Sequence, residues 1–297
     1  MDSCIQVRSV TKKFKDTVGL DGATLSAGKG ISIIIGPNGA GKSTLLRCIG
    51  GLYKPDSGAV RIFNRDPYYD DALRKRVSLL SDNYALYDML SVRKNLLFFG
   101  RLYGNRAKDT LEASKSMLKS LDALQFMDKK AGELSRGTKQ KVAICRALLG
   151  NPDVFLLDEP TAFLDAASAE KVHIMLEHLA AEGRSIIYAT QRLNEAARFR
   201  SDIFIIKKGR ISRKLSHKAL YGRVLRGATV SIKTADAVKE SIARNVPHLK
   251  EARGTTIIIS IKSYRDINES VKYLMDRGSY VIGVDYTEQM LEEMLAD

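Results

Sequence analysis

One loop, residues 36–44, constrains this chain more than any other stretch. Its sequence, GPNGAGKST, meets the phosphate-loop pattern G-x-x-x-x-G-K-[ST] at every required position. Residues 31–35 before it are short, apolar and mostly β-branched, as in a buried parallel strand. Residues 45–49 after it begin a helical pattern. A chance glycine-rich turn would lack these two flanks, so the loop predicts a nucleotide-binding site.

The chemistry of this loop follows from its place between a strand and a helix. The unpaired N–H groups at a helix start carry roughly half a positive charge, which suits a polyphosphate. Lys42 is expected to reach the terminal phosphates, and the hydroxyl of Ser43 to hold Mg²⁺, with Thr44 beside it. The other nucleotide-binding candidates in the loop are Gly36, Asn38, Gly39, Ala40 and Gly41.

Length and composition place the chain among ordinary globular proteins. Its 297 residues suit one large or two modest domains, and 44% of them are hydrophobic. No apolar run approaches the roughly 20 residues needed to cross a bilayer, and the first residues lack a signal-peptide core. The 3 cysteines have no metal spacing and read as small apolar residues in a reducing compartment. We therefore expect a cytoplasmic location.

The formal charge of +14 is spread along the chain and not gathered in one run. Nucleic acid, an anionic membrane surface and a well-solvated basic exterior are all compatible with it. Charge alone therefore does not choose among them.

Hydrophobic periodicity predicts an α/β core interrupted by helices. Residues 91–128 change to a helical period, which indicates an all-helical insertion between two strands. The predicted core elements are short strands within residues 4–35, strands near 59–63, 77–80, 154–157 and 186–189, a helix at 166–182 and a hairpin around 203–211.

A basic, glycine-containing stretch near residues 217–228 resembles a linker. Beyond it, strands and helices alternate as in a compact α+β module of the split-βαβ type. The predicted order is strand 230–232, helix 235–245, strand 255–261, helix 267–275, strand 280–284 and a last helix. The module contains no nucleotide motif, so we interpret it as a scaffold or regulatory domain.

A second half of a nucleotide site follows the apolar run 154–157, which ends in Asp158 and Glu159. Asp158 is expected to hold Mg²⁺, directly or through water, because hard cations take oxygen ligands. Glu159 is expected to polarise the water that attacks the γ-phosphate. An acidic strand end facing solvent is the alternative, and the phosphate loop argues against it.

The first ~220 residues resemble the ATP-binding subunit of an ABC transporter. The loop 36–44 matches the Walker A motif, 154–159 matches Walker B, 134–140 resembles the LSGGQ signature and 162–165 the D-loop. The resemblance implies a P-loop NTPase core of the ABC ATPase type with antiparallel β and helical subdomains, plus a small C-terminal α+β domain. It implies an ATP-binding domain over residues 1–218, with the helical insertion at about 88–134, and an accessory domain over 219–297.

The C-terminal module is similar to the accessory domain of certain drug, antibiotic and sodium exporters. That likeness rests on the order of elements and on the ending QMLEEM at residues 289–294. It implies a transport direction, namely export.

The resemblance also implies a head-to-tail dimer in which each ATP lies between two copies. Ser135 and the N–H of Gly137 would then contact the γ-phosphate across the interface, with Arg136 adding positive charge where many members have glycine. Ser135 is a favourable N-cap residue, which aims a helix start at the phosphate. Phe14 matches the aromatic position that stacks on adenine, with Val18 nearby, although a packed core phenylalanine is an alternative.

Two positions depart from the family pattern. Asp82 stands where the Q-loop glutamine is expected, and Gln191 stands at the switch histidine. At about 5 Å from a phosphate charge, Asp82 would be repelled by roughly 3 kcal/mol, so it must sit against Mg²⁺, take up a proton or move away. Gln191 can donate a hydrogen bond but cannot titrate near neutral pH. Either hydrolysis is slow, or both changes are tolerated; the sequence leaves both open.

These features predict an ATP-binding, ATP-hydrolysing subunit that powers an exporter from the inner face of the cell membrane. Its implied partners are a transmembrane permease, pressed by the surface around residues 84–101, and a second ATP-binding subunit in a homo- or heterodimer. A soluble ABC ATPase acting on nucleic acid or ribosomes is a weaker alternative, to which the charge of +14 lends mild support. Translation factors of this class usually carry two Walker A loops, and repair proteins carry a long coiled-coil insertion. A regulatory ATP switch without turnover is the third.

Overall fold

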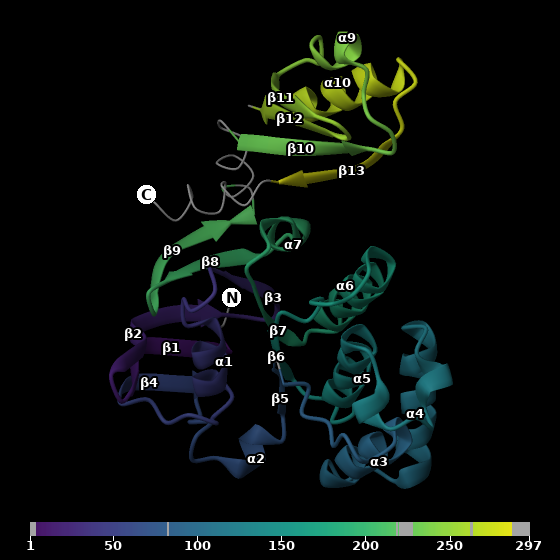
Figure 1. Ribbon diagram of the computed structural model, residues 1–297. Helices are drawn as coiled ribbons and strands as arrows, with labels where there is room; N and C mark the ends of the chain where they lie inside the picture. The colour runs from purple at the N-terminus through teal and green to yellow at the C-terminus, as the bar shows by residue number, and fades with distance from the viewer. Residues whose placement is uncertain (1–3, 82, 218, 220–227, 262–263, 287–297) are drawn as a thin grey trace. The chain divides into compact units, whose positions relative to one another are not determined.

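The computed structural model describes residues 4–81, 83–217, 219, 228–261 and 264–286 (Figure 1). The chain divides into two compact units. The first comprises Met1–Gln191 and Ser201–Lys214, and the second comprises Arg192–Arg200 and Leu215–Asp297. The domain boundary expected at residues 218–219 stays a prediction.

A six-stranded sheet forms the centre of the first unit. Its strand order is β5-β6-β7-β3-β8-β9, and every pairing from β5 to β8 is parallel. The strands are β3 Gly30–Ile35, β5 Val77–Leu80, β6 Val154–Asp158, β7 Ser185–Thr190, β8 Asp202–Lys207 and β9 Arg210–Ser216. All residues of β6 and β7 are buried, as expected for inner strands of a parallel sheet, and most of them are apolar.

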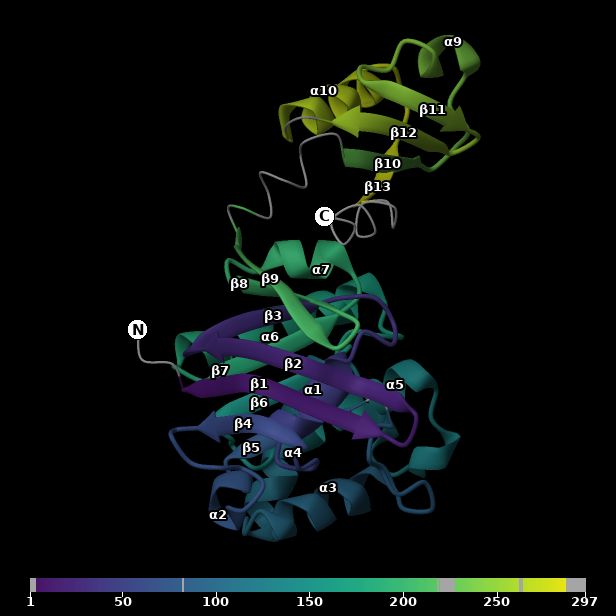
Figure 2. The ribbon, with the colours of Figure 1, turned by 90° about the vertical axis from the view of Figure 1, so that its left-hand side faces the viewer.

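A three-stranded antiparallel sheet packs over helix α1, Lys42–Ile49 (Figure 2). Its order is β2-β1-β4, with β1 Ile5–Phe14, β2 Thr17–Ala27 and β4 Ser57–Ile62. One apolar cluster joins these strands to α1 and to the inner strands of the large sheet. The helix that follows the phosphate loop is therefore clamped between two sheets, which fixes its N-terminus.

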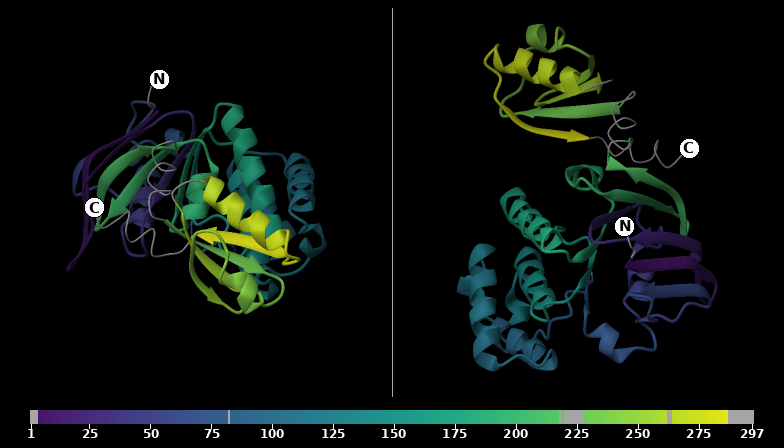
Figure 3. Two further views of the ribbon diagram at one scale, coloured as in Figure 1. Left: turned by 90° about the horizontal axis from the view of Figure 1, so that it is seen from above. Right: turned by 180° about the vertical axis from the view of Figure 1, so that it is seen from behind.

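The remaining helices of the first unit include the predicted helical insertion (Figure 3). Helices α3, α4 and α5 pack against one another, α5 also packs on β5, and α6 packs on β3 and β7. Their bounds are α2 Asp71–Arg74, α3 Val92–Leu102, α4 Ala107–Ser120, α5 Arg136–Leu148 and α6 Ala166–Ala181, with short 3₁₀ turns at Leu124–Phe126 and Ala131–Glu133.

The second unit contains helix α7, Leu193–Arg198, and a four-stranded antiparallel sheet in the order β11-β12-β10-β13. Helix α10 packs on β12 and β13. The elements are β10 Ala228–Thr234, α9 Glu240–Ala243, β11 Leu249–Arg253, β12 Thr256–Ile261, α10 Tyr264–Met275 and β13 Val281–Tyr286. This β-α-β-β-α-β order confirms the predicted split-βαβ type.

Three details differ from the sequence-based expectation. The strands before the phosphate loop are long and not short, because β1 and β2 pair as one hairpin with several register shifts. The helix expected at 235–245 is only Glu240–Ala243, and β11 was not expected, because this edge strand is largely exposed and polar. The last predicted helix lies outside the described residues.

The burial of Leu156 predicts how much strand β6 contributes to the stability of the fold. Leu156 is fully buried in the cluster around α1, so Leu156→Ala should lower the free energy of unfolding by about 2–5 kcal/mol. Leu52 is mostly exposed, so Leu52→Ala removes the same atoms at a cost within about 0.5 kcal/mol. Urea denaturation of both variants checks this, and equal losses would contradict the assigned core.

Candidate nucleotide-binding site

The phosphate loop connects the carboxyl end of β3 to the first residue of α1. No side chain caps this helix, whose N-cap Gly41 has a left-handed backbone with φ 106°. A Cβ at Gly41 would lie 2.5 Å from the carbonyl oxygen of Gly19, so only glycine fits there. A Cβ at Gly36 would lie 2.3 Å from the carbonyl oxygen of Ile206. Both glycines are therefore required by close backbone contacts.

A hollow of about 370 Å³ lies against this loop. It brings together residues from the start of β2, the phosphate loop and the end of β6, which are far apart in the sequence. Its lining residues are Phe14, Thr17, Val18, Gly19, Asn38, Gly39, Gly41, Lys42, Ser43, Thr44, Asp158 and Glu159. Of the predicted loop residues, Gly36 and Ala40 are buried and do not line it.

Thr17 and Gly19 line the hollow but were not predicted. A Cβ at Gly19 would lie 2.9 Å from the ring of Phe14 and 3.2 Å from Thr44. A glycine beside the aromatic position is the sequence signal that could have pointed to this contact.

Lys42 is buried and folds back onto its own loop. Its Nζ donates to the carbonyl oxygens of Gly36 at 2.8 Å and Pro37 at 3.1 Å, and lies 3.8 Å from Oε1 of Glu159. Burial lowers the pKa of Lys42, while the charges of Glu159 and Asp158 act to raise it. The ammonium group is thus partly desolvated and already next to the hollow, as a phosphate ligand requires.

Asp158 and Glu159 occupy the carboxyl end of β6. Asp158 is buried at the edge of the hollow. Oε1 of Glu159 accepts a hydrogen bond of 2.8 Å from the backbone N–H of Gln191, and Oε2 accepts one of 3.1 Å from Oγ1 of Thr190. The Glu159 side chain remains 24% exposed. Its carboxylate is held in one orientation and is still open to water.

Of the two positions that depart from the family pattern, the structure describes only Gln191. Gln191 engages Glu159 through its backbone, and its side chain is exposed. Asp82 lies outside the described residues. The role of Thr190 was not predicted, because it depends on the register between β6 and β7, in which Asp158 faces Ala189.

Phe14 and Val18 flank the open side of the hollow. The Phe14 ring is 39% exposed and packs edge-on against Tyr53, with centroids 5.4 Å apart. Lys12 Nζ lies 5.7 Å from the ring centroid. Phe14 is therefore not a buried core residue, and half-exposed Val18 adds an apolar surface beside it.

The signature residues start helix α5 and do not line the hollow. Ser135 is the N-cap, and its hydroxyl accepts a hydrogen bond of 3.2 Å from the N–H of Thr138. Arg136 is exposed and lies over the ring of Phe163 at 5.3 Å. A Cβ at Gly137 would lie 2.6 Å from the carbonyl oxygen of Phe163. These three residues thus form a separate surface within one chain.

The residues of the hollow fit a cation that shares its ligands with phosphates. Ser43 offers a hydroxyl and Asp158 a carboxylate, and Mg²⁺ is usually bound by one or two carboxylates plus substrate phosphates and water. Within the described residues, no cluster of three or more histidine, cysteine or acidic residues forms a metal cage. Ser43 and Asp158 are the residues that would hold Mg²⁺ beside a phosphate.

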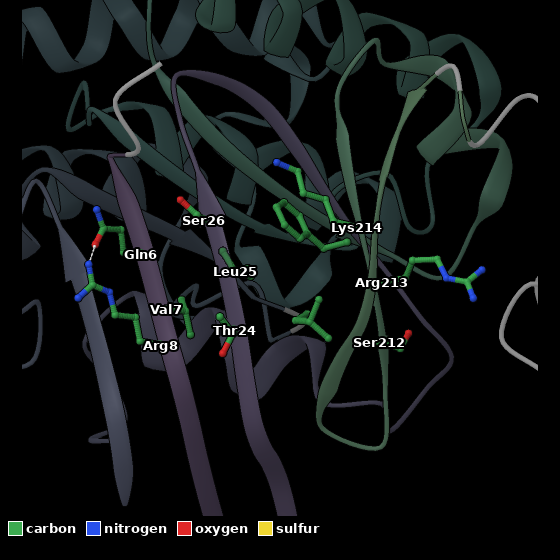
Figure 4. A pocket seen from close by; sticks show the side chains of 11 residues that line it. Gln6, Val7, Arg8, Thr24, Leu25, Ser26, Ser212, Arg213 and Lys214 are labelled. Carbon is green, nitrogen blue, oxygen red and sulfur yellow. Dashed lines mark hydrogen bonds between the residues drawn. The ribbon is translucent and has the colours of Figure 1, made fainter. Parts of the chain in front are cut away.

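A larger hollow of about 620 Å³ lies elsewhere, between β1, β2, β8 and β9 (Figure 4). Arg8, Arg213 and Lys214 give it a basic rim, and Lys214 also pairs with Asp202 at 2.7 Å. It contains no predicted site residue. Chemistry, and not size, therefore identifies the nucleotide site. No helix in the described part of the chain is long and apolar enough to cross a membrane.

Comparison with known proteins agrees with this geometry. The family model described as "ABC transporter" matches residues 20–162. The Nod factor export ATP-binding protein I of Burkholderia lata is 35% identical over 209 residues, which cover 69% of this chain and 68% of that protein. NatA of Bacillus subtilis, an ABC transporter ATP-binding protein, is 32% identical over 190 residues, covering 63% of this chain and 77% of NatA.

This chain is also similar to an ATP-binding protein named for import. The spermidine/putrescine import ATP-binding protein PotA of Nitratidesulfovibrio vulgaris is 32% identical over 224 residues, covering 74% of this chain and 60% of PotA.

Among solved structures, a dimeric ATP-binding cassette in a post-hydrolysis state with ADP and Pi is 29% identical, with a TM-score of 0.66. That match covers 72% of this chain and 98% of the solved chain. This chain therefore belongs to the ABC transporter family, as an ATP-binding cassette subunit and an ATPase coupled to transport.

Proposed function

We propose that this chain is the ATP-hydrolysing subunit of an exporter and works as a head-to-tail dimer against a transmembrane permease on the inner face of the cell membrane. The observation that carries the proposal is the meeting of Lys42, Asp158 and Glu159 around one hollow. The signature surface at Ser135, Arg136 and Gly137 lines no part of that hollow, so a second copy would supply it.

The charged and hydroxyl residues Lys42, Ser43, Asp158 and Glu159 have distinct tasks in this proposal. Lys42 would exchange its carbonyl partners for the terminal phosphates, and the free N–H groups of α1 would cradle the rest. Ser43 and Asp158 would hold Mg²⁺, which neutralises phosphate charge when bound. Glu159 would accept the proton of the attacking water, with its carboxylate aimed by Thr190 and the Gln191 N–H.

Dimer formation is supported by the position of Ser135 and Arg136. Ser135 caps α5, so the positive end of a long helix lies beside an exposed arginine. Such a surface suits a phosphate presented by another copy. The related cassette with ADP and Pi is dimeric.

The direction of transport is the finer part of the proposal. Relatives include a Nod factor export protein and a spermidine/putrescine import protein, so the ATP-binding unit alone does not choose. We favour export because the sequence of the C-terminal module resembles the accessory domain of drug, antibiotic and sodium exporters in its predicted element order and in its ending QMLEEM at residues 289–294. The formal charge of +14 is compatible with nucleic acid as a partner, but it does not distinguish nucleic acid from a well-solvated basic surface.

ATP hydrolysis by the purified chain tests the central proposal. Replacing the carboxylate by an amide, Glu159→Gln, removes the proton acceptor and should lower turnover about 100-fold or more. Affinity for Mg·ATP should remain, because the phosphate loop is untouched. Glu112→Gln, on the exposed face of α4, should behave as wild type. Undiminished turnover in Glu159→Gln would refute the assignment, and a wild-type protein without turnover would support the regulatory switch.

The proposed adenine contact is tested by Phe14→Ala. Loss of the aromatic face should weaken ATP binding by about 1–3 kcal/mol, the range found for base stacking on aromatic side chains. Phe14→Tyr should retain affinity, because its ring is kept. Phe98 on α3 is 40% exposed, nearly the same as Phe14, so Phe98→Ala is a matched control. Calorimetric titration of the three variants measures the difference, and equal affinities would exclude stacking.

Substitution of Gln191 distinguishes slow hydrolysis from tolerated substitutions, the two alternatives that the sequence leaves open. An imidazole titrates near neutral pH, so Gln191→His should raise the turnover number about tenfold or more. The backbone N–H that holds Glu159 survives the change. Gln191→Asn keeps a non-titrating amide and should leave the rate low. Steady-state phosphate release measures the turnover number of each variant. If Gln191→His does not change the turnover number, the glutamine at this position is tolerated.

A further inference from the structure

A buried chain of three polar side chains lies behind the end of β6. The hydroxyls of Thr161 and Tyr188 share a hydrogen bond of 3.0 Å, and Nε2 of His173 lies 3.4 Å from the Tyr188 hydroxyl. All three residues are buried. They come from three elements, namely the turn after β6, strand β7 and helix α6.

The segment that this chain reaches is held in an unfavourable backbone conformation. Glu159 has φ 46°, in the left-handed region that non-glycine residues seldom adopt. A non-glycine residue keeps such a conformation only where its surroundings over-determine it. The turn is restrained locally, since the Ala162 N–H donates to the Glu159 carbonyl oxygen at 3.0 Å. Gln140 Nε2 also donates to the Pro160 carbonyl oxygen at 2.8 Å.

Strand β7 contacts this segment at three successive residues. Tyr188 and Thr190 are two apart, so their side chains lie on the same face of the strand. The first bonds Thr161 and the second bonds the Glu159 carboxylate. Between them, the carbonyl oxygen of Ala189 accepts the N–H of Glu159 at 2.9 Å. One strand thus holds both the carboxylate and the turn that carries it.

Apolar side chains could fill this part of the core in place of these polar side chains. Phenylalanine at 188 and valine at 161 would fill similar volumes without burying hydroxyls, which cost free energy unless they are bonded. The hydrogen bond is directional, whereas apolar packing is not. The contact therefore restrains the turn in a way that apolar side chains would not.

We propose that Tyr188, oriented by His173, is a positioning residue for the catalytic carboxylate. Its hydroxyl fixes Thr161 and hence the angle at which Glu159 leaves β6 and meets Thr190 and the Gln191 N–H. This inference rests on the proposed role of Glu159 in hydrolysis. It assigns a part in catalysis to His173 of α6 and Tyr188 of β7, although neither residue lines the hollow.

The test is Tyr188→Phe, which removes one oxygen atom. Misplacing a reacting group by about 1 Å can cost 100-fold in rate, so we expect kcat to fall about tenfold or more. KM for ATP and the affinity for Mg·ATP should not change, because no residue of the hollow is altered. Thr161→Val should have the same effect, and Thr161→Ser, which keeps the hydroxyl, should restore the rate. Tyr188→Phe combined with Thr161→Val should be no worse than either alone.

Thr110→Val is the matched control. Thr110 on α4 is also buried, and its hydroxyl has no hydrogen-bond partner among the described residues. The substitution removes the same atom outside the chain of three and should leave kcat unchanged. Melting temperatures are measured for all variants, so that rates are compared where each one is folded.

The outcomes separate this inference from the proposed function. Full kcat in folded Tyr188→Phe and Thr161→Val, with a lowered melting temperature only, would overturn the positioning role. If Tyr188→Phe does not fold, the comparison of Thr161→Val with Thr161→Ser decides the question. If Glu159→Gln itself retains full turnover, the role of Glu159 fails, and the positioning role fails with it. Loss of turnover in Glu159→Gln together with full turnover in Tyr188→Phe overturns the positioning role alone.

Discussion

The parallel register of β6, β7 and β3 is the constraint on which the site depends. Asp158 lies opposite Ala189, and Ile35 lies opposite Thr190, so these strands end at one edge of the sheet. The phosphate loop leaves from β3, the acidic pair from β6, and the groups that hold Glu159 from β7. A shift of one residue between β6 and β7 would move Thr190 away from the carboxylate, because strand side chains alternate between faces.

Helix α1 could hold phosphates only because both of its sides are packed. Its apolar residues join the antiparallel sheet on one side and the parallel sheet on the other. The N-terminus is then fixed, with Gly41 in a conformation that a side chain would strain. Phe14, at the end of β1, is brought to the same hollow by the antiparallel sheet that covers α1. The packing that forms the core therefore also positions the residues of the nucleotide site.

How much of this could be predicted depends on whether the signal is local. The phosphate loop and the pair Asp158–Glu159 were predicted because each lies within a few residues of an apolar strand. Thr190, Thr17 and the chain from His173 to Thr161 were not, because their neighbours are set by strand order and register. The short α9 and the polar edge strand β11 were missed for another reason: neither buries enough apolar surface to leave a periodic pattern.

The charges of the hollow explain why a nucleotide and a divalent cation would bind together. One buried ammonium, Lys42, faces two carboxylates, Asp158 and Glu159, so the local charge is negative without a ligand. The N-terminus of α1 offsets only about half a charge. A polyphosphate alone would meet repulsion from both acids, whereas Mg²⁺, if held by Asp158 and Ser43 as proposed, would reverse the balance. If Lys42 bound the terminal phosphates, the Glu159 carboxylate would keep its hydrogen bonds to Thr190 and the Gln191 N–H and would face water.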